Sequence, residues 1–553
     1  MRFTAALWQA LTAAVGTRFG QARFDTAHFP NGMRCSGVRF AGPAYFEGAF
    51  FEGEALFTGA EFADYAGFEA ARFTGGAYFR EVRFHGEARF VAVRFGSGAF
   101  FDGVSCASTA RFAHAWFEGA AAFTSAGFQG SVHFTEARFL RPSDTSADFS
   151  DAHFAKSAGF YGARFQGRAV FAQAIFEHEW RGPVVCTDEL WMRGAVFKAP
   201  LRIGIAAQRV DMNRVRCDST AAFHLRYAAV SLRDAVLAEP ITLSYEPMPF
   251  MAGTRPLEQE MPRDEGSVAV HLLRLSGVNA AHLVLTDVDL SRCEFSGAYH
   301  LDQISLSGRC GYGTPPLGLR HGSTWFSICW WSPRRVVVEE QYWRALPGEN
   351  RTDADTDGWL TGLGHPDPAQ SPTADDVAIV YRQLRKALED TKNEPGAADF
   401  YYGEMEMRRH NKATPRGERA LLHAYWLLSG YGLRASRAVA ALLCAMAVTV
   451  LLLLLYGLPG APPTPRMTGR IPAGGGEVVL TPDTAAKKPP KSLHRFSTAR
   501  MERAGRVVVN SVVFRSSGQD LTQQGVWIEM GSRLCEPVLF GLAVLAARGR
   551  VQR

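Results

Sequence analysis

The sequence has few of the features that mark a secreted or a metal-binding protein. Its 9 cysteines include no C-x-x-C pair, and their odd number does not fit a disulfide framework. We therefore expect reduced, buried thiols in a cytosolic environment. In the first 20 residues Trp8 and Gln9 interrupt a short apolar run, and no small-residue cleavage site follows. This pattern favours a capping helix over residues 1–21 rather than a signal peptide.

The sequence also has none of the motifs of the common enzyme classes. It contains no P-loop, no G-x-S-x-G elbow and no H-E-x-x-H pair. The segment DADTDG places Asp353, Asp355, Asp357 and Gly358 at the spacing of the first half of a calcium loop, but the twelfth position, which should be Glu, is Gly364. We interpret this segment as a solvated acidic linker. We expect no catalytic residue, no cofactor site and no metal site.

A strong excess of charge of one sign is absent as well. The chain has 60 Lys and Arg residues against 54 Asp and Glu residues, which gives a formal net charge of +6. Over 553 residues this excess is too diffuse to indicate a nucleic-acid-binding protein. The length itself is sufficient for several domains.

The dominant feature of the sequence is a regular spacing of phenylalanine. In ARFTGGAYFREVRFHGEARFVAVRF, residues 71–95, the steps between rings alternate six and five. Cysteine takes the ring position at 35 and 106, and a small residue stands two positions before nearly every ring. A pair at i−2 and i on one side is the signature of a strand, so these rings are expected in a β core. The core positions predicted from this series include Phe73, Phe79, Phe84, Phe90, Phe95, Phe101, Phe112, Phe117, Phe123 and Phe128.

An 11-residue period can also mark a right-handed coiled coil. Steps of five and six, however, turn a helix by about 500° and 600° and would scatter the rings around its axis. The pattern instead predicts short strands and turns that stack so that each ring lies on the ring one coil below. This is the arrangement of a solenoid, in which each unit buries its core only against its neighbours.

The tandem triplets ARF, AYF, VRF and GAF over residues 22–176 resemble pentapeptide repeats of the phenylalanine-centred kind. The resemblance implies a right-handed quadrilateral β-helix, a mainly β solenoid, with the i−2 and i side chains pointing inward. The regular sixth residue, such as Gly76 or Glu87, departs from the family's pattern. It predicts a wider coil, in which two units of five plus six residues close one turn.

The rest of the chain is expected to continue this solenoid and then change character. Residues 177–310 keep a weaker version of the step and form a degenerate continuation with an insertion near 245–266. A tryptophan-rich cap and acidic linker is expected at 311–372, and a helical juxtamembrane linker at 373–436. The first helix of that linker is predicted from about Asp375 to Thr391, with Thr373 and Asp376 forming a capping box.

A long run without charge follows this linker. Residues 438–458 hold 21 uncharged residues, enough to cross a hydrocarbon core of about 30 Å as a helix. Arg434 and Arg437 precede the run and suit the cytoplasmic side. We expect a transmembrane helix over 437–458, a basic Pro/Gly-rich loop over 459–533, and a second short hydrophobic segment with a basic tail over 534–553. Whether this second segment crosses the membrane is left open.

The order of these parts is similar to that of bacterial pentapeptide-repeat proteins in which the solenoid leads through a helix into a two-helix, ion-channel-like module. Asp399 to Arg409 match the linker helix of those proteins, and residues 438–458 lie where the first pore helix would be. The stretch RSSGQDLTQQG stands where a potassium filter of the T-x-G-Y-G type would lie, and it has no such motif.

We therefore expect a non-enzymatic, membrane-anchored scaffold in the cell membrane, with a cytoplasmic repeat domain that binds an unknown protein partner. Membrane lipid is the other expected contact. The alternative is a subunit of a homo-oligomeric, ion-channel-like protein with a degenerate selectivity filter.

The exposed position before each ring is rich in arginine. We interpret these arginines as a surface ladder that could bind anionic lipid or nucleic acid, or as ordinary solubilising residues. The best-known role of pentapeptide-repeat proteins, mimicry of DNA to bind topoisomerase, requires an acidic rod and is not expected. The predicted ladder consists of Arg72, Arg83, Arg89, Arg94 and Arg111.

Overall fold

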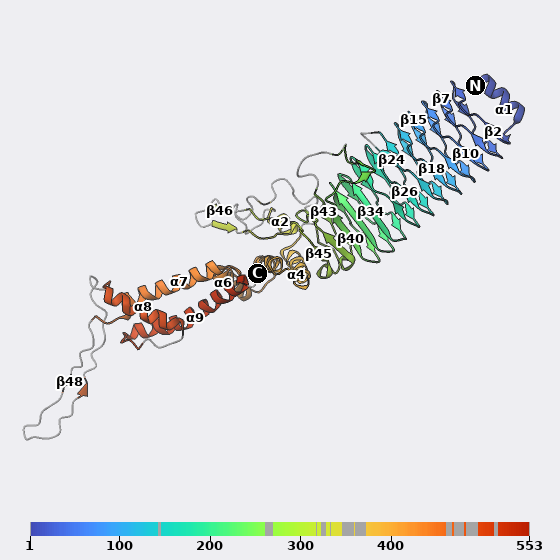
Figure 1. Cartoon of the computed structure of the whole chain (residues 1–553). Coiled ribbons are helices and arrows are strands. Elements are labelled where there is room, and N and C mark those ends of the chain that lie inside the picture. Colours follow the sequence, from blue (N-terminus) through green and yellow to red (C-terminus); the bar gives the residue numbers. More distant parts are fainter. Residues whose placement is uncertain are drawn as a thin grey trace, which may run out of the picture. The chain divides into compact units, whose positions relative to one another are not determined.

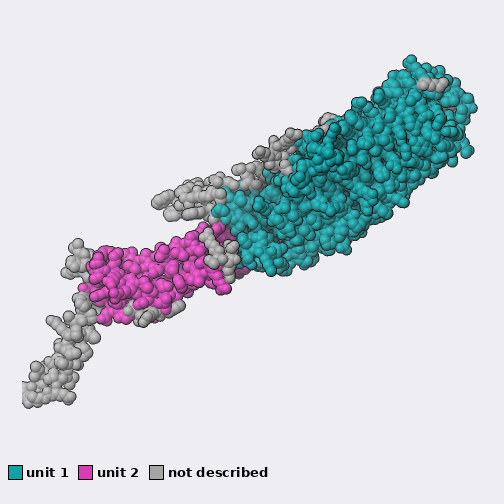
Figure 2. All heavy atoms as spheres, in the orientation of Figure 1, with its two compact units in different colours: residues 1–401 teal, residues 402–553 magenta. Residues whose placement is uncertain are grey.

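The computed structural model of the chain forms two compact units, residues 1–401 and 402–553 (Figures 1 and 2). The calcium-like segment 353–358 and residues 515–517 of the filter-like stretch lie outside the described residues. The structure describes residues 2–141, 145–259, 261, 269–316, 318–321, 328–331, 333–345, 359, 372–460, 467–468, 481–482, 496–513 and 518–551.

Unit 1 is a four-sided solenoid of parallel strands, most of them very short. Each regular coil contributes one strand to each sheet, so a strand there pairs with the strand four places later (Figure 1). We number the sheets by their first strand. Sheet 1 has 11 strands from β1 (Arg18–Phe19) to β39 (Val236–Leu237), sheet 2 has 8 from β2 (Ala22–Arg23) to β30 (Trp180–Arg181), sheet 3 has 13 from β3 (His28–Phe29) to β45 (Ser305–Ser307), and sheet 4 has 11 from β4 (Met33–Arg34) to β43 (His271–Arg274).

The strand register gives the length of each coil. Phe73 pairs with Phe95 and Ala77 with Ala99, so one coil in this region takes two complete units of five plus six, as the spacing predicts. Later coils are shorter. Phe176 pairs with Phe197, so that coil is one residue shorter, and Cys217 pairs with Leu237, so that coil is two residues shorter. The coil therefore narrows towards the C-terminal end of the solenoid, where aliphatic side chains replace most of the rings in the core.

The core of the wide coils consists of four ladders of stacked rings. In sheet 3 the centroids of Phe51 and Phe73 lie 4.5 Å apart with the ring planes 1° from parallel. Rings of neighbouring ladders meet edge to face, as Phe90 and Phe101 do at 5.4 Å and 88°, which is a favoured aromatic geometry. All ten predicted core rings are 2 % exposed or less. Cys106 occupies a ring position, and burial raises the pKa of its thiol to about 12.

The N-terminal helix α1 (Ala5–Val15) lies over the first coil. Trp8 stacks on Phe19 at 6.0 Å, and its Nε1 donates a hydrogen bond to the Arg34 carbonyl at 3.0 Å. Phe3, just before the helix, stacks on Phe29 at 5.2 Å. Trp8 and Phe3 thus cover Phe19 and Phe29, the first-coil rings of their ladders, which would otherwise be exposed to water.

At the other end of the solenoid, helices α2 (Val338–Ala345) and α4 (Ala374–Asp390) are joined by a buried ionic network. Glu340 accepts hydrogen bonds from Arg334 at 2.5 Å, Arg344 at 2.7 Å and the Tyr381 hydroxyl at 2.5 Å. The capping box of Thr373 and Asp376 is present, which confirms the predicted helix start to within one residue. Because every charge in the network has a partner, we assign it a structural role.

The predicted insertion is a short excursion between β40 (Ile241–Tyr245) and β43. It contains the antiparallel pair β41 (Met251–Ala252) and β42 (Arg255–Pro256). Arg226 holds it to the solenoid through a buried ion pair with Glu258 at 2.8 Å. The insertion therefore leaves the stacking of the coils intact: β40 pairs directly with β44 (Leu283–Thr286).

Unit 2 is helical. Its elements are α6 (Arg416–Ser429), α7 (Ala435–Leu452), the π-turn η4 (Leu453–Gly457), α8 (Thr498–Val512) and α9 (Gln523–Val551); α5 (Glu394–His410) contains the boundary between the units. An apolar cluster packs α8 against η4, and it includes Leu453, Leu454, Leu458, Ala504, Val507, Val508 and Leu521.

This arrangement differs from the loop expected over 459–533, since that range contains α8 and the start of α9. Helix α8 buries Ala504, Val507, Val508 and Ser511, which recur at helical spacing within an otherwise basic segment. Helix α9 is also 29 residues long, far longer than the apolar segment predicted from 534 onward.

Candidate interaction surfaces

Each strand of the regular coils points one side chain outward, and this fixes where the predicted arginine ladder lies. Arg72 and Arg94 are partners in sheet 3, and Arg89 and Arg111 are partners in sheet 2. Arg83 lies in sheet 1, between Glu61 and Ser105. The five arginines therefore occupy three faces of the solenoid as two neighbouring pairs and one separate residue.

Carboxylates from the turns neutralise several of these arginines. Arg89 forms ion pairs with Glu69 at 2.9 Å and with Glu87 at 3.0 Å, and Arg111 contacts the same Glu87 at 2.7 Å. Arg94 pairs with Glu118 at 2.6 Å. Burial alone would raise the pKa of Glu87, but the hydrogen bonds from Arg111 and Arg89 hold that pKa below its ordinary value.

The whole repeat region is accordingly close to neutral. Residues 22–176 contain 14 Lys and Arg against 15 Asp and Glu, a net charge of −1. Counting only the position before each ring finds the arginines and misses the acids, because most of the acids lie in the turns. The region is neither a basic rod suited to nucleic acid nor an acidic rod.

One outward row of side chains nevertheless keeps a distinct character. It runs along sheet 3, and we name it the sheet 3 row: His28, Phe50, Arg72, Arg94, Trp116, Arg138 and Arg164. The guanidinium carbons of Arg94 and Arg138 lie 5.5 Å and 4.7 Å from the centre of a Trp116 ring. Arg72, Arg138 and Arg164 have no ion pair within the described part of the chain, so the row carries excess positive charge.

Two helices of unit 2 present apolar side chains to their surroundings. The stretches Ala435–Gly457 and Gln523–Arg548 are each long and apolar enough to cross a membrane. The exposed large apolar residues are Val439, Leu443, Val448, Leu451, Leu452 and Tyr456 on the first, and Val526, Trp527, Met530, Leu534, Val538, Phe540, Val544 and Leu545 on the second.

Some polar side chains of these helices are buried instead, among them Thr449, Glu529, Ser532 and Glu536. Glu536 of α9 is fully buried, and its carboxylate accepts hydrogen bonds from Thr449 of α7 at 2.9 Å and from Ser511 of α8. One carboxylate thus links three helices. Gly457 and Gly525 meet at such close range that a Cβ on Gly525 would lie 2.4 Å from the Gly457 carbonyl oxygen.

Comparisons with known proteins bear on unit 1 alone. Residues 36–83 and 68–116 match the family model for pentapeptide repeats in 9 copies. No curated protein and no solved structure matches the chain. The matched residues form part of the wide coils with four inward ring ladders, so residues 36–116 of this chain are pentapeptide repeats within a β-solenoid.

Proposed function

We propose that this protein is a membrane-anchored scaffold whose solenoid binds a protein partner along the sheet 3 row. The observation that carries the anchoring is the apolar exterior of α7 and α9. Exposed leucine, valine and aromatic side chains along both helices would be costly in water, whereas hydrocarbon accommodates them.

The packing of α7 against α9 puts the solenoid and the C-terminal tail on one side of the membrane. The start of α7 packs against the end of α9 through Ala438, Ala543 and Ala546. The basic residues Arg434 and Arg548 therefore belong to the same end of the helix pair. The solenoid and the C-terminal tail therefore lie on the same side of the membrane, and we propose that this side is the cytoplasm. The segment between α7 and α9 is basic as well, so the vesicle experiment below decides the side.

The sheet 3 row suits an acidic protein partner. Tryptophan and arginine are the side chains most enriched at the energetic centres of protein interfaces. Here Trp116 lies between two guanidinium groups on a rigid sheet with strands about 4.8 Å apart. The partner would supply carboxylates for Arg72, Arg138 and Arg164, which lack them in the described structure.

A photo-crosslinking amino acid at position 116 of the full-length protein, expressed in its own membrane, tests the partner face. We expect a discrete protein adduct from position 116 and none from position 78, which lies outward on sheet 4. The same adducts from both positions would contradict a binding face on sheet 3. Protease treatment of inverted vesicles tests the topology, because a cytoplasmic solenoid would be digested there and would be protected in right-side-out vesicles.

A second candidate is an oligomeric, ion-conducting subunit. The observation that favours it is α8, a 15-residue helix between the two candidate spans that packs on η4 beside α9. A tetramer by mass measurement together with current in a planar bilayer would favour the channel. A monomer that carries no current would leave the scaffold as the sole candidate.

A further inference from the structure

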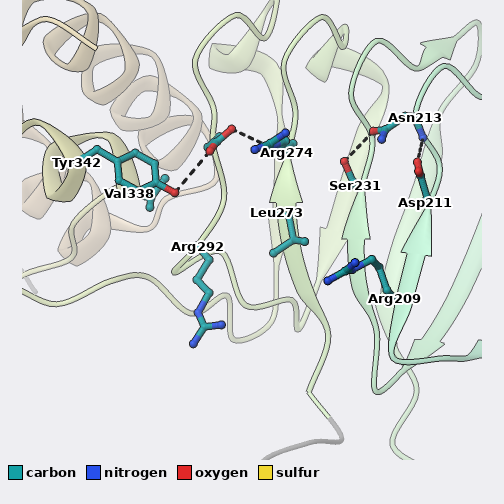
Figure 3. Close-up of a pocket in the computed structure, with 10 residues that line it drawn as sticks. Arg209, Asp211, Asn213, Ser231, Leu273, Arg274, Arg292, Val338 and Tyr342 are labelled. Atoms are coloured by element: carbon teal, nitrogen blue, oxygen red, sulfur yellow. Dashed lines mark hydrogen bonds and ion pairs between the residues drawn. The ribbon is translucent and has the colours of Figure 1, made fainter. Parts of the chain in front are cut away.

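A cavity of about 470 Å³ opens on the outer face of sheet 4, among the narrow coils of the solenoid (Figure 3). Its lining includes side chains of β35 (Arg209–Asp211), β38 (Ala229–Ser231), β43 and α2. The two carboxylates of this lining already have cationic partners, Asp211 with Arg193 at 2.8 Å and Glu294 with Arg274 at 3.0 Å. A carboxylate removed from water needs such a partner, because burial penalises its charge.

The helical unit neutralises two of its buried carboxylates in the same way. Glu406 of α5 pairs with Arg409 at 2.6 Å, and Glu529 of α9 pairs with Arg533 at 2.6 Å. Glu536, about two turns further along α9, is different. It is fully buried, and it has no ion pair within the part of the chain that the structure describes. It also lies at the middle of Gln523–Arg548, one of the two stretches that could span a membrane.

The only polar contacts of the Glu536 carboxyl group within the described residues are with hydroxyl groups. Thr449 Oγ1 lies 2.9 Å from Oε1, and Ser511 Oγ contacts Oε2. Each hydroxyl also contacts a carbonyl oxygen of its own helix, that of Ala445 at 3.0 Å and that of Val508 at 2.7 Å. Two hydroxyl hydrogens therefore serve four acceptor contacts. A hydrogen on the carboxyl group would supply a third, because that group would donate to Ser511 Oγ and Ser511 would donate to the Val508 carbonyl.

The charged groups of the helices packed around Glu536 lie elsewhere or are paired. Arg437 stands at the start of α7, which packs on the last part of α9. In α8, Arg506 pairs with Glu502 at 2.5 Å, and Arg500 donates to three carbonyl groups near η4. No other described titratable side chain of α6, α7, η4, α8 or α9 bonds to the carboxyl group; these are Arg416, Glu418, Arg419, His423, Tyr425, Cys444, Tyr456, Arg503, Cys535 and Arg548.

We propose that Glu536 binds a proton in the native helical unit, so that α7, α8 and α9 meet at a neutral carboxylic acid. A charge at the middle of a membrane span is costly without a partner, and a proton removes that cost. Thr449 contacts the carboxyl group directly, which leaves no position between them for a larger cation. The position at the middle of the membrane rests on the proposed anchoring, whereas the burial and the contacts do not. Loss of the proton would leave an unpaired charge among three helices and loosen their packing.

Infrared spectroscopy of the full-length protein in lipid nanodiscs at neutral pH tests this proposal. A protonated carboxyl group gives a C=O stretching band, whereas an ionised one gives the two bands of a carboxylate. Glu536→Gln keeps the size of the side chain and removes the acid. We therefore expect the difference between the wild type and Glu536→Gln to show the loss of one protonated carboxyl band, which shifts in D₂O. Glu339 contributes equally to both spectra and cancels.

Glu529→Gln is the matched control, because it makes the same change in the same helix at a carboxylate that is paired with Arg533. It should remove carboxylate bands and leave the protonated carboxyl band unchanged. Loss of carboxylate bands from Glu536→Gln as well would show that Glu536 is ionised and would overturn the proposal.

Thr449→Val gives a second measurement with Glu536 in place, so the test does not depend on the folding of Glu536→Gln. It removes one hydrogen bond to the carboxyl group, and the protonated carboxyl band should move to higher frequency. A shift of carboxylate bands alone would contradict the proposal. Protein that stays outside the nanodiscs would contradict the membrane anchoring, while its spectrum would still decide whether Glu536 is protonated.

Discussion

Replacing Phe90 with alanine measures how much the stacked rings stabilise the solenoid. Phe90 is fully buried, and its ring lies 4.9 Å from Phe68 and 4.9 Å from Phe112 in the same ladder. Phe79 and Phe101 contact it edge to face at 5.3 Å and 5.4 Å. Truncating a buried phenylalanine costs about 3–5 kcal/mol. We expect about 4 kcal/mol, because five aromatic contacts are lost, the fifth being the edge-to-face contact with Phe84 at 6.0 Å, and the hydrogen-bonded coils prevent the cavity from collapsing.

Hydrogen–deuterium exchange of the full-length protein, read by mass spectrometry, locates this loss. Because each coil contacts only its neighbours, the effect should be concentrated in the coils next to the substitution. The amides of Phe68 and Phe90 donate to the carbonyls of Arg89 and Arg111, each at 2.7 Å, and would report it. A loss of about 4 kcal/mol corresponds to exchange faster by about three orders of magnitude.

Two further variants calibrate this result. Phe90→Leu keeps an apolar side chain in the ladder, and we expect a cost nearer 1 kcal/mol. Tyr78→Ala removes a half-exposed ring from the outer face of sheet 4 and should cost less than about 1 kcal/mol. If Phe90→Ala and Tyr78→Ala accelerated exchange equally, the ring ladders would not be the source of stability that their geometry indicates.

Three other experiments test separate parts of the structure. Burial raises the pKa of Glu339 to about 7, so the folded state favours the protonated acid. The free energy of unfolding of the wild type should therefore fall as the pH rises from about 4.5 to 7. In urea titrations, the free energy of unfolding of Glu339→Gln relative to that of the wild type should rise by up to about 3 kcal/mol between pH 4 and pH 8. An unchanged difference across that range would contradict the assigned burial of the charge. Gly525→Ala should destabilise the helix pair by about 1–3 kcal/mol, because its Cβ would lie 2.4 Å from the Gly457 carbonyl oxygen. Gly541→Ala is the control, because a Cβ there would have no atom within 4 Å. Equal melting temperatures of the two variants in detergent would refute the close contact. Cys106 should resist maleimide until the solenoid unfolds, since its thiol is buried with a pKa of about 12, and labelling of the native protein would show that the ladder opens there.

The sequence was a good guide to the solenoid because its information is local and periodic. The step of five and six places Phe73, Phe79, Phe84 and Phe90 on four successive sides, and four such steps add up to the observed length of one coil. The charge balance of the surface was harder to predict. Glu87 neutralises Arg111 from the coil before it, and only the register brings the two side chains together.

The packing of the helical unit and the cavity could not be predicted from the sequence, because both depend on contacts between residues far apart in the chain. Glu536 and Pro537 interrupt the apolar run in the sequence, yet Thr449 and Ser511 satisfy the Glu536 carboxylate from other helices. The cavity on the outer face of sheet 4 combines the irregular strand pairing beside Ser231 with Tyr342, a residue more than a hundred positions from Arg209. Nothing in the neighbourhood of either residue in the sequence indicates such a site.

The narrowing of the coil has a consequence for how this chain can grow or be engineered. Duplicating one complete wide coil, such as the segment from Phe73 up to Phe95, returns every ring to its own ladder. Inserting one of the narrow coils there, such as the segment from Cys217 up to Leu237, would bring inward positions to the corners, because its turn is shorter. In the same way, a wide coil inserted among the narrow coils would shift their inward positions. The solenoid therefore contains two incompatible modular units, and segments can be exchanged within each part but not between them.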